Sequence, residues 1–167
     1  MDGMTPNVLT PDQQTLLAAW QQHTHAEFVL KDADATLATM TENPYLLMMA
    51  TGTACVGRAA VREYYADHFL SAIPPDLELA SLSQTIGSDR LVEEMVVRFT
   101  HTIEMDWLPT GRRAEFIIAA VIGFEDGKVA HEHIYWDQAT LLSQMGVLNY
   151  PLAAAGTGSV RQLSRLR

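Results

Sequence analysis

The chain has 167 residues, 48% of them hydrophobic, and a formal net charge of −9 that comes from 20 acidic and 11 basic residues. This length supports one well-buried core and is too short for two ordinary domains. The acidic balance argues against nucleic acid as a partner. We expect one domain over residues 1–150, followed by a mobile tail over residues 151–167.

The cellular location is constrained by what the sequence lacks. Cys55 is the single cysteine, which excludes an internal disulfide and a cysteine-based zinc cluster and fits a reducing compartment. The N-terminus has no basic region followed by a long apolar run, and no stretch approaches the roughly 20 apolar residues that cross a bilayer. The sequence therefore predicts a cytoplasmic protein with no membrane partner.

The N-terminal part predicts a long helix. Thr10-Pro11-Asp12-Gln13 has the form of a capping box with proline at the first helical position, and it predicts a helix over residues 11–30. His23 and His25 are two residues apart and diverge on a helix, so we interpret both as surface residues. The stripe that should pack on the rest of the protein consists of Leu16, Leu17, Trp20, Thr24, Glu27 and Phe28.

Shorter elements follow this helix. A second helix is expected from Asp32 or Asp34 to about Thr41, and Pro44 should stop it. The apolar run over residues 45–50 suits a buried strand, although its leucines and methionines also suit a helix. A third helix is expected after Gly57, and the two prolines at 74 and 75 should end it.

From Leu77 onward the sequence alternates as strands do, with Gly87-Ser88-Asp89 as the first turn. One parity from residue 91 to 105 is mostly apolar, and His101 lies on it. Residues 114–124 are apolar on both parities, as expected of a strand covered on both faces. Because three helices cover only one face, we expect a homodimer through the outer sheet face.

Ionisable and aromatic residues are concentrated in residues 131–146, after an Asp126-Gly127 hairpin turn. Helical spacing follows the strand, and Gly146 suits the end of that helix. A period of two puts four polar groups on one face of the strand and three residues on the other. The first set is His131, His133, Tyr135 and Asp137, and the second is Glu132, Ile134 and Trp136.

Several motifs within residues 12–148 together carry a family resemblance. They are Gly57 with the helix through Tyr64 and Tyr65, the turn Asp126-Gly127-Lys128, and Trp136-Asp137 with Leu141, Leu142, Gln144 and Gly146. In this order they resemble the nuclear-transport-factor-2-like superfamily, and within it the SnoaL-like polyketide cyclase group. The resemblance implies an α+β, cystatin-like cone, in which a curved mixed β-sheet and three N-terminal helices enclose one apolar pocket.

The resemblance also implies a reaction, because in SnoaL-like cyclases an aspartate near the end of the last strand is the general acid/base. Asp137 matches that position, and His101 and His133 are the expected assisting catalytic residues. The implied function is a polyketide-cyclase-like lyase or isomerase that needs no cofactor and acts on a small apolar or aromatic carbonyl ligand. A carboxyl group in a dry pocket has a raised pKa, which suits proton transfer at neutral pH. The expected substrate-binding residues are Tyr45, Tyr135, Phe99 and Met105.

Other interpretations of the same residues stay open. Asp137 also suits the N-cap of the last helix, and His101 suits a hydrogen-bonded core histidine. His131 and His133 with His101 fit a metal-binding pattern, but they lack a clear carboxylate partner, so no metal is predicted. His101, His133 and Tyr45 also imitate the histidines and tyrosine of scytalone-dehydratase-like members. The competing class is a non-catalytic ligand-binding or assembly module on the same cone.

Overall fold

The structure is a computed structural model that describes residues 8–105 and 108–148. Its centre is a six-stranded curved sheet in the order β2-β1-β6-β5-β4-β3. β1 pairs with β6 in parallel, and every other neighbouring pair is antiparallel. The predicted α+β fold with a curved mixed sheet is therefore confirmed.

The first helix begins and extends as predicted. α1 spans Pro11–His25, and the Thr10 hydroxyl accepts a hydrogen bond from the Gln13 N–H while the Gln13 side chain accepts one from the Thr10 N–H. The chain continues directly into a π-helical segment, η1, over Ala26–Leu30. Lys31 ends the helix in a left-handed conformation with φ of 52°.

The second helix is shorter than predicted. α2 spans Ala33–Ala38, with Asp32 as its N-cap, and the strand β1 begins soon after it and spans Met40–Met48. Pro44 thus lies inside a strand rather than after a helix. The pairing of β1 with β6 shifts register between Met40 and Tyr45, and such a bulge is where a strand tolerates proline.

The third helix is confirmed after Gly57, but it has three parts. α3 spans Arg58–Glu63, a second π-helical segment, η2, spans Tyr64–Phe69, and a 3₁₀ turn, η3, spans Leu70–Ala72. No sequence pattern indicated β2, Thr53–Val56, because this strand is four residues long and mostly exposed.

The remaining elements follow the predicted meander. β3 is Glu78–Ile86, β4 is Arg90–Thr100, β5 is Arg113–Glu125 and β6 is Lys128–Trp136. Asp126 and Gly127 both have positive φ, 51° and 72°, in the turn between the last two strands. α4, Gln138–Met145, ends at Gly146 with φ of 72°.

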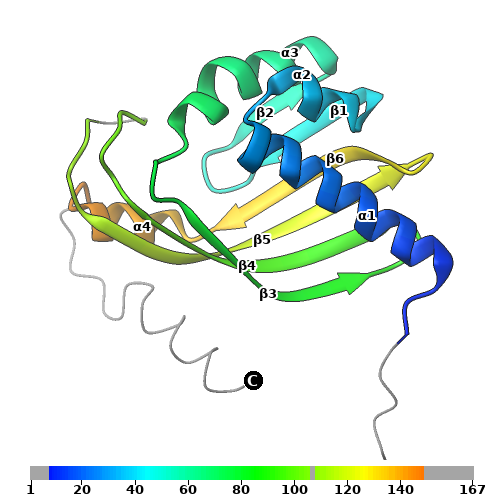
Figure 1. Cartoon of the computed structure of the whole chain (residues 1–167). Helices are drawn as coiled ribbons and strands as arrows, with labels where there is room; N and C mark the ends of the chain where they lie inside the picture. The colour runs from blue at the N-terminus through cyan, green and yellow to red at the C-terminus, as the bar shows by residue number, and fades with distance from the viewer. Residues whose placement is uncertain (1–7, 106–107, 149–167) are drawn as a thin grey trace, which may run out of the picture.

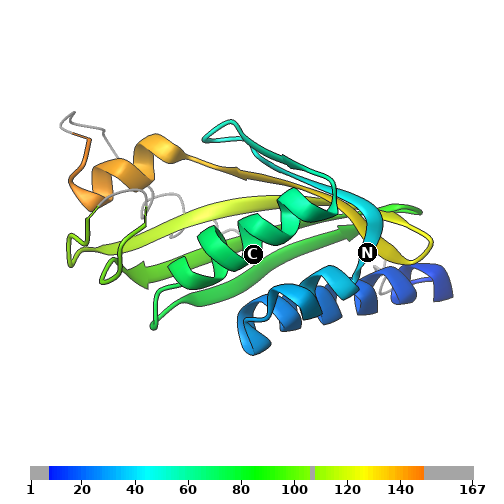
Figure 2. The ribbon, with the colours of Figure 1, turned by 90° about the horizontal axis from the view of Figure 1, so that it is seen from above.

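The helices α1, α2 and α3 lie over one face of the sheet, and α4 lies toward one end of it (Figure 1; Figure 2). Two apolar clusters fill the space on this face. The larger one joins Leu16 and Trp20 of α1 to Ala120 and Ile122 of β5. The smaller one joins residues of β4 and β5 to Leu141 and Met145 of α4.

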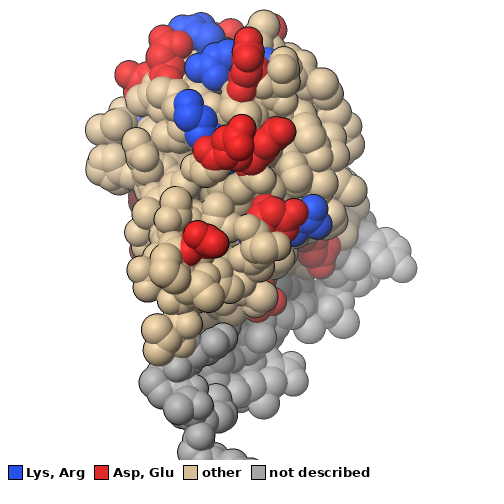
Figure 3. Space-filling model, turned by 90° about the vertical axis from the view of Figure 1, so that its right-hand side faces the viewer, with Lys and Arg blue, Asp and Glu red and all other residues tan. Residues whose placement is uncertain are grey.

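Charged groups are unevenly distributed over the surface. On the face shown in Figure 3, acidic and basic side chains lie side by side at the top, and most of the remaining described surface is uncharged. This face therefore carries no continuous basic surface among the described residues. None of the helices within residues 8–105 and 108–148 combines the length and the apolar character needed to cross a membrane.

Candidate functional site

Four ionisable side chains from four elements meet between the helices and the sheet. His23 comes from α1, Glu27 from η1, Tyr65 from η2 and Glu132 from β6. Their exposed fractions are only 0%, 4%, 2% and 4%. Charged side chains are rarely buried this completely unless they are paired. We call these four residues the buried acid–base cluster.

Glu132 and His23 form the centre of the cluster. The His23 Nε2 atom lies 3.1 Å from Glu132 Oε1 and 3.4 Å from Glu27 Oε1. The Tyr65 hydroxyl donates a 2.7 Å hydrogen bond to Glu132 Oε1 and lies 3.3 Å from His23 Nε2. One imidazole therefore faces two carboxyl groups and a phenol.

The hydrogen bonds indicate which atoms of His23 carry protons. Nδ1 lies 2.6 Å from the Thr39 hydroxyl, which itself donates a 2.6 Å hydrogen bond to the Thr36 carbonyl. The hydroxyl has one proton, so it accepts from Nδ1–H. Nε2 in turn faces acceptor oxygens of Glu132 and Glu27. Both nitrogens therefore act as donors, and His23 is an imidazolium.

The pKa values of the cluster agree with this assignment. Burial alone would lower the pKa of His23, but the charges and hydrogen bonds of Glu27 and Glu132 outweigh it and raise this pKa to about 10. Burial would raise the pKa of Glu132, yet His23 and the Tyr65 hydrogen bond lower it overall. Burial and the charge of Glu132 raise the pKa of Glu27. Burial and the same carboxylates raise the pKa of Tyr65.

With a pKa of about 10, His23 carries a positive charge at neutral pH, and the lowered pKa of Glu132 keeps its carboxylate ionised beside that charge. The raised pKa values of Glu27 and Tyr65 favour their protonated forms. Pairing of the buried charges reduces the large cost of an unpaired charge in a low-dielectric interior. Two carboxyl groups whose pKa values are pushed apart also form the usual arrangement of an acid beside a base.

Two of the four residues lie in π-helical segments. Glu27 belongs to η1 and Tyr65 to η2. π-helical turns are rare and occur frequently at functional sites, because they redirect side chains at a cost in helix geometry. Both long helices over the sheet therefore deviate from α geometry where they supply a residue to the cluster.

The concave face next to the cluster is apolar. Ile134 and Trp136 follow Glu132 at intervals of two on β6, so they lie on the same side of the sheet. Both are only partly buried, as are Met95 on β4 and Ile118 on β5. Glu93 is another buried acidic residue near the cluster. It accepts a 2.6 Å hydrogen bond from the Trp20 indole, and the Trp20 ring stacks on His23.

The cluster also includes a potential metal-binding arrangement. One ligand atom each from His23, Glu27 and Glu132 lie within 4.8 Å of one another, and a divalent ion could bridge atoms at this spacing. A histidine that binds a metal must be neutral at the ligating nitrogen, so an ion at this position would have to displace the Nε2 proton of His23, whose pKa is about 10. We describe the cluster as a hydrogen-bonded acid–base group.

The structure places Asp137 and His101 apart. Asp137 is the N-cap of α4, where its carboxylate accepts hydrogen bonds from the N–H and hydroxyl of Thr140 at 3.0 and 2.6 Å. His101 contacts Thr110, whose hydroxyl lies 3.7 Å from the sulfur of Met145 at the other end of α4. An eight-residue helix is about 12 Å long, so the two side chains lie near opposite ends of α4.

Asp137 thus has the capping geometry that the sequence also allowed. It is exposed, and the hydrogen bonds from Thr140 lower its pKa, whereas a dry pocket would raise it. His101 is fully buried, and its Nδ1 atom accepts a hydrogen bond from the Thr110 N–H at 3.1 Å. This is the geometry of a core histidine that holds a loop.

His133 and Tyr135 lie on the face of the sheet away from the helices, because they alternate along β6 with Glu132, which faces the cluster. Tyr45 on β1 lies on the same face, since its ring contacts His131 and His133. Tyr45 stacks on His131 with ring centroids 4.8 Å apart, and His131 stacks on His133 at 4.7 Å. The Nε2 atoms of both histidines have no hydrogen-bond partner among the described residues. These residues therefore lie on the opposite face of the sheet from the buried acid–base cluster.

Phe99 and Met105 lie on the helix-covered side, as expected of substrate-binding residues. Phe99 is buried against Phe116 in the smaller apolar cluster, and Met105 packs against the same cluster. Their contact with a substrate stays a prediction. β4 ends at Thr100, so the predicted strand alternation does not continue to His101 or Met105.

The sequence interpretation missed His23 as a site residue. His23 is fully buried, which contradicts the surface position predicted for it, and of the two histidines only His25 is exposed. The signal was present in the spacing, since Trp20, His23 and Glu27 lie on the apolar stripe at intervals of three and four. A histidine and a glutamate on such a stripe indicate a buried polar pair.

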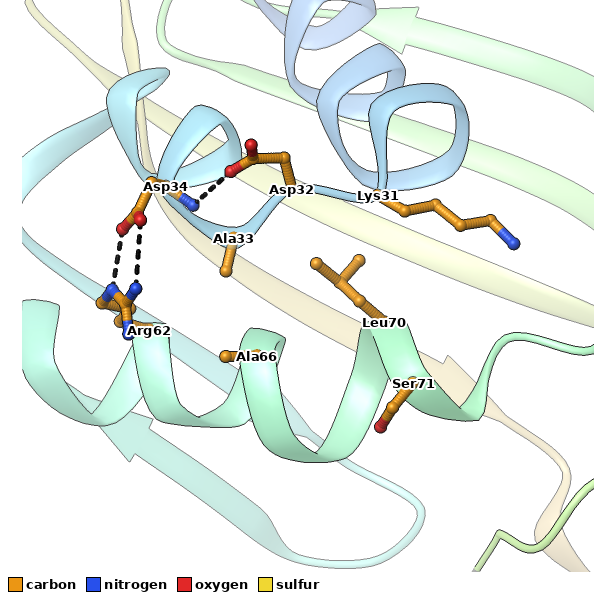
Figure 4. Close-up of a pocket in the computed structure, with 8 residues that line it drawn as sticks. All are labelled: Lys31, Asp32, Ala33, Asp34, Arg62, Ala66, Leu70 and Ser71. Carbon is orange, nitrogen blue, oxygen red and sulfur yellow. Dashed lines mark hydrogen bonds and ion pairs between the residues drawn. The ribbon is translucent and has the colours of Figure 1, made fainter.

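A separate hollow of about 440 Å³ opens on the surface between α2 and η2 (Figure 4). Arg62 and Asp34 span it with two hydrogen bonds of 2.7 and 3.0 Å. Both side chains are largely exposed, 52% and 73%, so solvent screens this ion pair. The described residues that line the hollow include no histidine and no buried acid, and we do not assign the active site to it.

Comparisons with solved structures agree on the fold. A proposed SnoaL-like polyketide cyclase from Jannaschia sp. CCS1 superposes with a TM-score of 0.71 at 15% identity, covering 87% of this chain and 100% of its own. AclR, a proposed hydroxylase from Streptomyces galilaeus, has a TM-score of 0.66 at 21% identity and coverages of 92% and 99%. A protein with a ketosteroid isomerase-like fold from Catenulispora acidiphila DSM 44928 has a TM-score of 0.61 at 14% identity, with coverages of 86% and 100%.

Sequence comparison identifies the family. No curated protein matches the chain. The sequence model described as SnoaL-like polyketide cyclase matches residues 16–145, which include His23, Glu27, Tyr65 and Glu132. This match covers well over half of the 167 residues and confirms the resemblance that the motifs indicated. The chain therefore belongs to the SnoaL-like polyketide cyclase family.

Proposed function

We propose that this protein is a cofactor-free lyase or isomerase that moves a proton on a carbon next to a carbonyl group. Its substrate is a small apolar or aromatic carbonyl compound, and cyclisation of a polyketide-like substrate is the concrete version. The observation that carries this proposal is the pair Glu27 and Glu132, two buried carboxyl groups with oppositely shifted pKa values beside His23 and Tyr65.

The proposed step transfers protons only between the substrate and the two glutamates of the cluster. Glu132 accepts the proton from the substrate carbon as the C–H bond breaks, and Glu27 donates its proton to the carbonyl oxygen, giving an enol. Tyr65 and His23 stabilise whichever carboxyl group is ionised, because both contact the two glutamates electrostatically. A proton returned from one glutamate to the other then restores the starting state.

The apolar part of the substrate has a surface beside the cluster. We propose that it lies along Met95, Ile118, Ile134 and Trp136, which are partly buried on the helix-covered side of the sheet. The acid–base cluster itself is covered by the helices, so substrate binding must move α1 or α3 away from β6. The departures from α geometry in η1 and η2 support such movement, since they interrupt the regular hydrogen bonding of these helices.

The closed cluster also favours a second candidate function. Four side chains exposed by 4% or less can act simply as a polar link between helices and sheet, which suits a non-catalytic ligand-binding module of the same fold. A thermal-shift screen with apolar and aromatic carbonyl compounds, followed by turnover assays on each stabilising compound, separates the two. Stabilisation by many unrelated compounds without turnover of any would support the binding module.

The decisive variant is Glu27→Gln, which keeps the size of the side chain and removes its acidic proton. We expect turnover to fall by about 10²–10⁴-fold, the usual contribution of a general acid or base, with substrate binding retained. Glu42→Gln, at an exposed position on β1, is the matched control. Unchanged turnover in Glu27→Gln would contradict the proposed mechanism, and activity that depends on added divalent metal would replace it with a metal-dependent one.

A further inference from the structure

Thr39 connects the cluster to two other elements of the fold. It follows the last residue of α2 as the C-cap, and its carbonyl oxygen accepts a 3.1 Å hydrogen bond from the Val129 N–H of β6. Its hydroxyl lies 2.6 Å from Nδ1 of His23 on α1. The sequence patterns did not point to Thr39, because a lone threonine at a helix end is common.

The direction of the Thr39 hydrogen bonds is fixed by a third residue. The hydroxyl proton is directed to the Thr36 carbonyl at 2.6 Å, and a hydroxyl has one proton to donate. Thr39 therefore presents only lone pairs to His23. An unprotonated Nδ1 would place two acceptors 2.6 Å apart, whereas a protonated one makes a short hydrogen bond.

We propose that Thr39 is a positioning residue that keeps a proton on Nδ1 of His23 in both charge states of the ring. Nε2, which faces Glu132, Glu27 and Tyr65, is then the one nitrogen of this imidazole that gains and loses a proton. The catalytic meaning of this inference rests on the proposed function, but the location of the proton does not.

The surroundings of the ring are consistent with this division of roles. The charged and titratable groups that face His23 come from η1, η2 and β6, namely Glu27, Tyr65 and Glu132, and all of them lie on the Nε2 side. Trp20 stacks on the ring with centroids 5.5 Å apart and an interplanar angle of 16°, which restricts its rotation. The Nδ1 side has the neutral hydroxyl of Thr39.

The experiment is NMR of the full chain with ¹⁵N-labelled histidine, in which the His23 signals are assigned by their loss in His23→Gln. Nitrogen chemical shifts distinguish protonated from unprotonated ring nitrogens. We expect both His23 nitrogens to carry protons at pH 7, and only Nδ1 to do so once the ring is neutral. A neutral ring protonated at Nε2 would overturn the proposal.

Two matched variants test the role of the hydroxyl. Thr39→Val replaces it with a methyl group, and we expect the pKa of His23 to fall by about one unit or more and the neutral ring to take its proton at Nε2. Thr36→Val makes the same change three residues earlier, where the hydroxyl donates a hydrogen bond to the Asp32 carbonyl. It should leave the His23 signals unchanged.

Thr39→Ser keeps the hydroxyl and should retain both the pKa and the tautomer of His23, so the proposal stays testable if Thr39→Val does not fold. Unaltered His23 signals in Thr39→Val would also overturn it. The outcome is independent of turnover: if Glu27→Gln leaves activity intact, the proposed function fails while the tautomer assignment can still be correct.

Discussion

Gly123 on β5 lies directly beneath the imidazole ring of His131 on β6. The two residues are register partners, and a Cβ atom built on Gly123 would lie 2.0 Å from Cε1 of His131. Real Cβ atoms do not approach other atoms this closely, so the ring occupies the space that any side chain would need. Glycine is required here for close approach rather than for a special φ angle.

Replacing Gly123 with alanine should therefore displace His131 and the aromatic stack that continues to Tyr45 and His133. We expect a loss of about 1–3 kcal/mol in the free energy of unfolding, as for other overpacked sites, measured by urea denaturation. Gly87→Ala is the control, because its nearest neighbour would be at 3.5 Å. Equal effects of the two substitutions would contradict the close approach.

The pH dependence of stability should reveal His23. Its pKa in the folded protein, about 10, is above the ordinary value of 6.5, so its stabilising contribution is fully present below pH 6.5 and lost as the pH rises through 10. We expect the free energy of unfolding to decline across this window, by up to about 1.4 kcal/mol per pH unit. The raised pKa of Glu27 contributes with the same sign.

Urea titrations at several pH values would measure this slope. His23→Gln should remove the His23 part of it, whereas His25→Gln, which changes an exposed histidine two residues away on the same helix, should not. An identical slope in all three proteins would mean that His23 is not charged in the folded state.

Asp137 allows a test of its capping role. Asp137→Ala should cost about 0.5–2 kcal/mol of stability because the Thr140 N–H loses its acceptor, while Asp137→Asn keeps most of the cap. The pKa of Asp137 is lowered in the folded protein, so its contribution is present above pH 3.8 and lost as the pH falls through the folded value. Turnover lost in Asp137→Asn with normal stability would instead support the catalytic role predicted from the sequence.

The outer face of the sheet is the expected dimer interface. Its β5 residues include Ile117, Ala119 and Val121, which alternate with residues that face the helices. Val121→Lys should place a charge in the centre of this face and favour the monomer, with an unchanged circular dichroism spectrum. Sedimentation of both proteins at micromolar concentration is the measurement, and a monomeric parent protein would contradict the prediction.

Gln144 should be important for holding α4 against the sheet. Its amide accepts a 2.7 Å hydrogen bond from the Glu115 N–H and donates a 2.8 Å one to the Glu115 carbonyl, as a neighbouring strand would. Gln144→Ala leaves both backbone groups unpaired in a partly buried site, and we expect a loss of about 1–3 kcal/mol. Gln22→Ala, at an exposed position on α1, should be nearly neutral in the same unfolding assay.

The fold could be predicted because its signals are local. Alternation of apolar residues along β4, the Asp126-Gly127 turn and the Thr10 capping box each depend on residues close together in the sequence, and all three are confirmed. The early start of β1 was missed because proline usually marks the edge of a strand. Only its pairing with β6, a distant segment of the chain, shows that a bulge accommodates Pro44.

The site was harder to predict because it depends on contacts between distant segments. His23 and Glu132 are separated by 109 positions in the chain, and neither is unusual in its own element. The alternation along β6 correctly placed Glu132 on the face opposite His131. The site was nevertheless predicted on the His131 face, because that face has more polar residues. Four polar residues there suggested chemistry, whereas the single glutamate among apolar neighbours was the buried one.

The two π-helical segments mean that the cluster depends on helix register as well as on residue identity. Each such turn holds one residue more than an α-helical turn, so deleting one residue from Ala26–Leu30 would rotate α1 by about 100° relative to α2. His23 would then turn away from Glu132, although every cluster residue would still be present. Relatives with the same sheet but one residue fewer in this helix should bury a different set of α1 side chains, and in aligned sequences a single gap would mark the change.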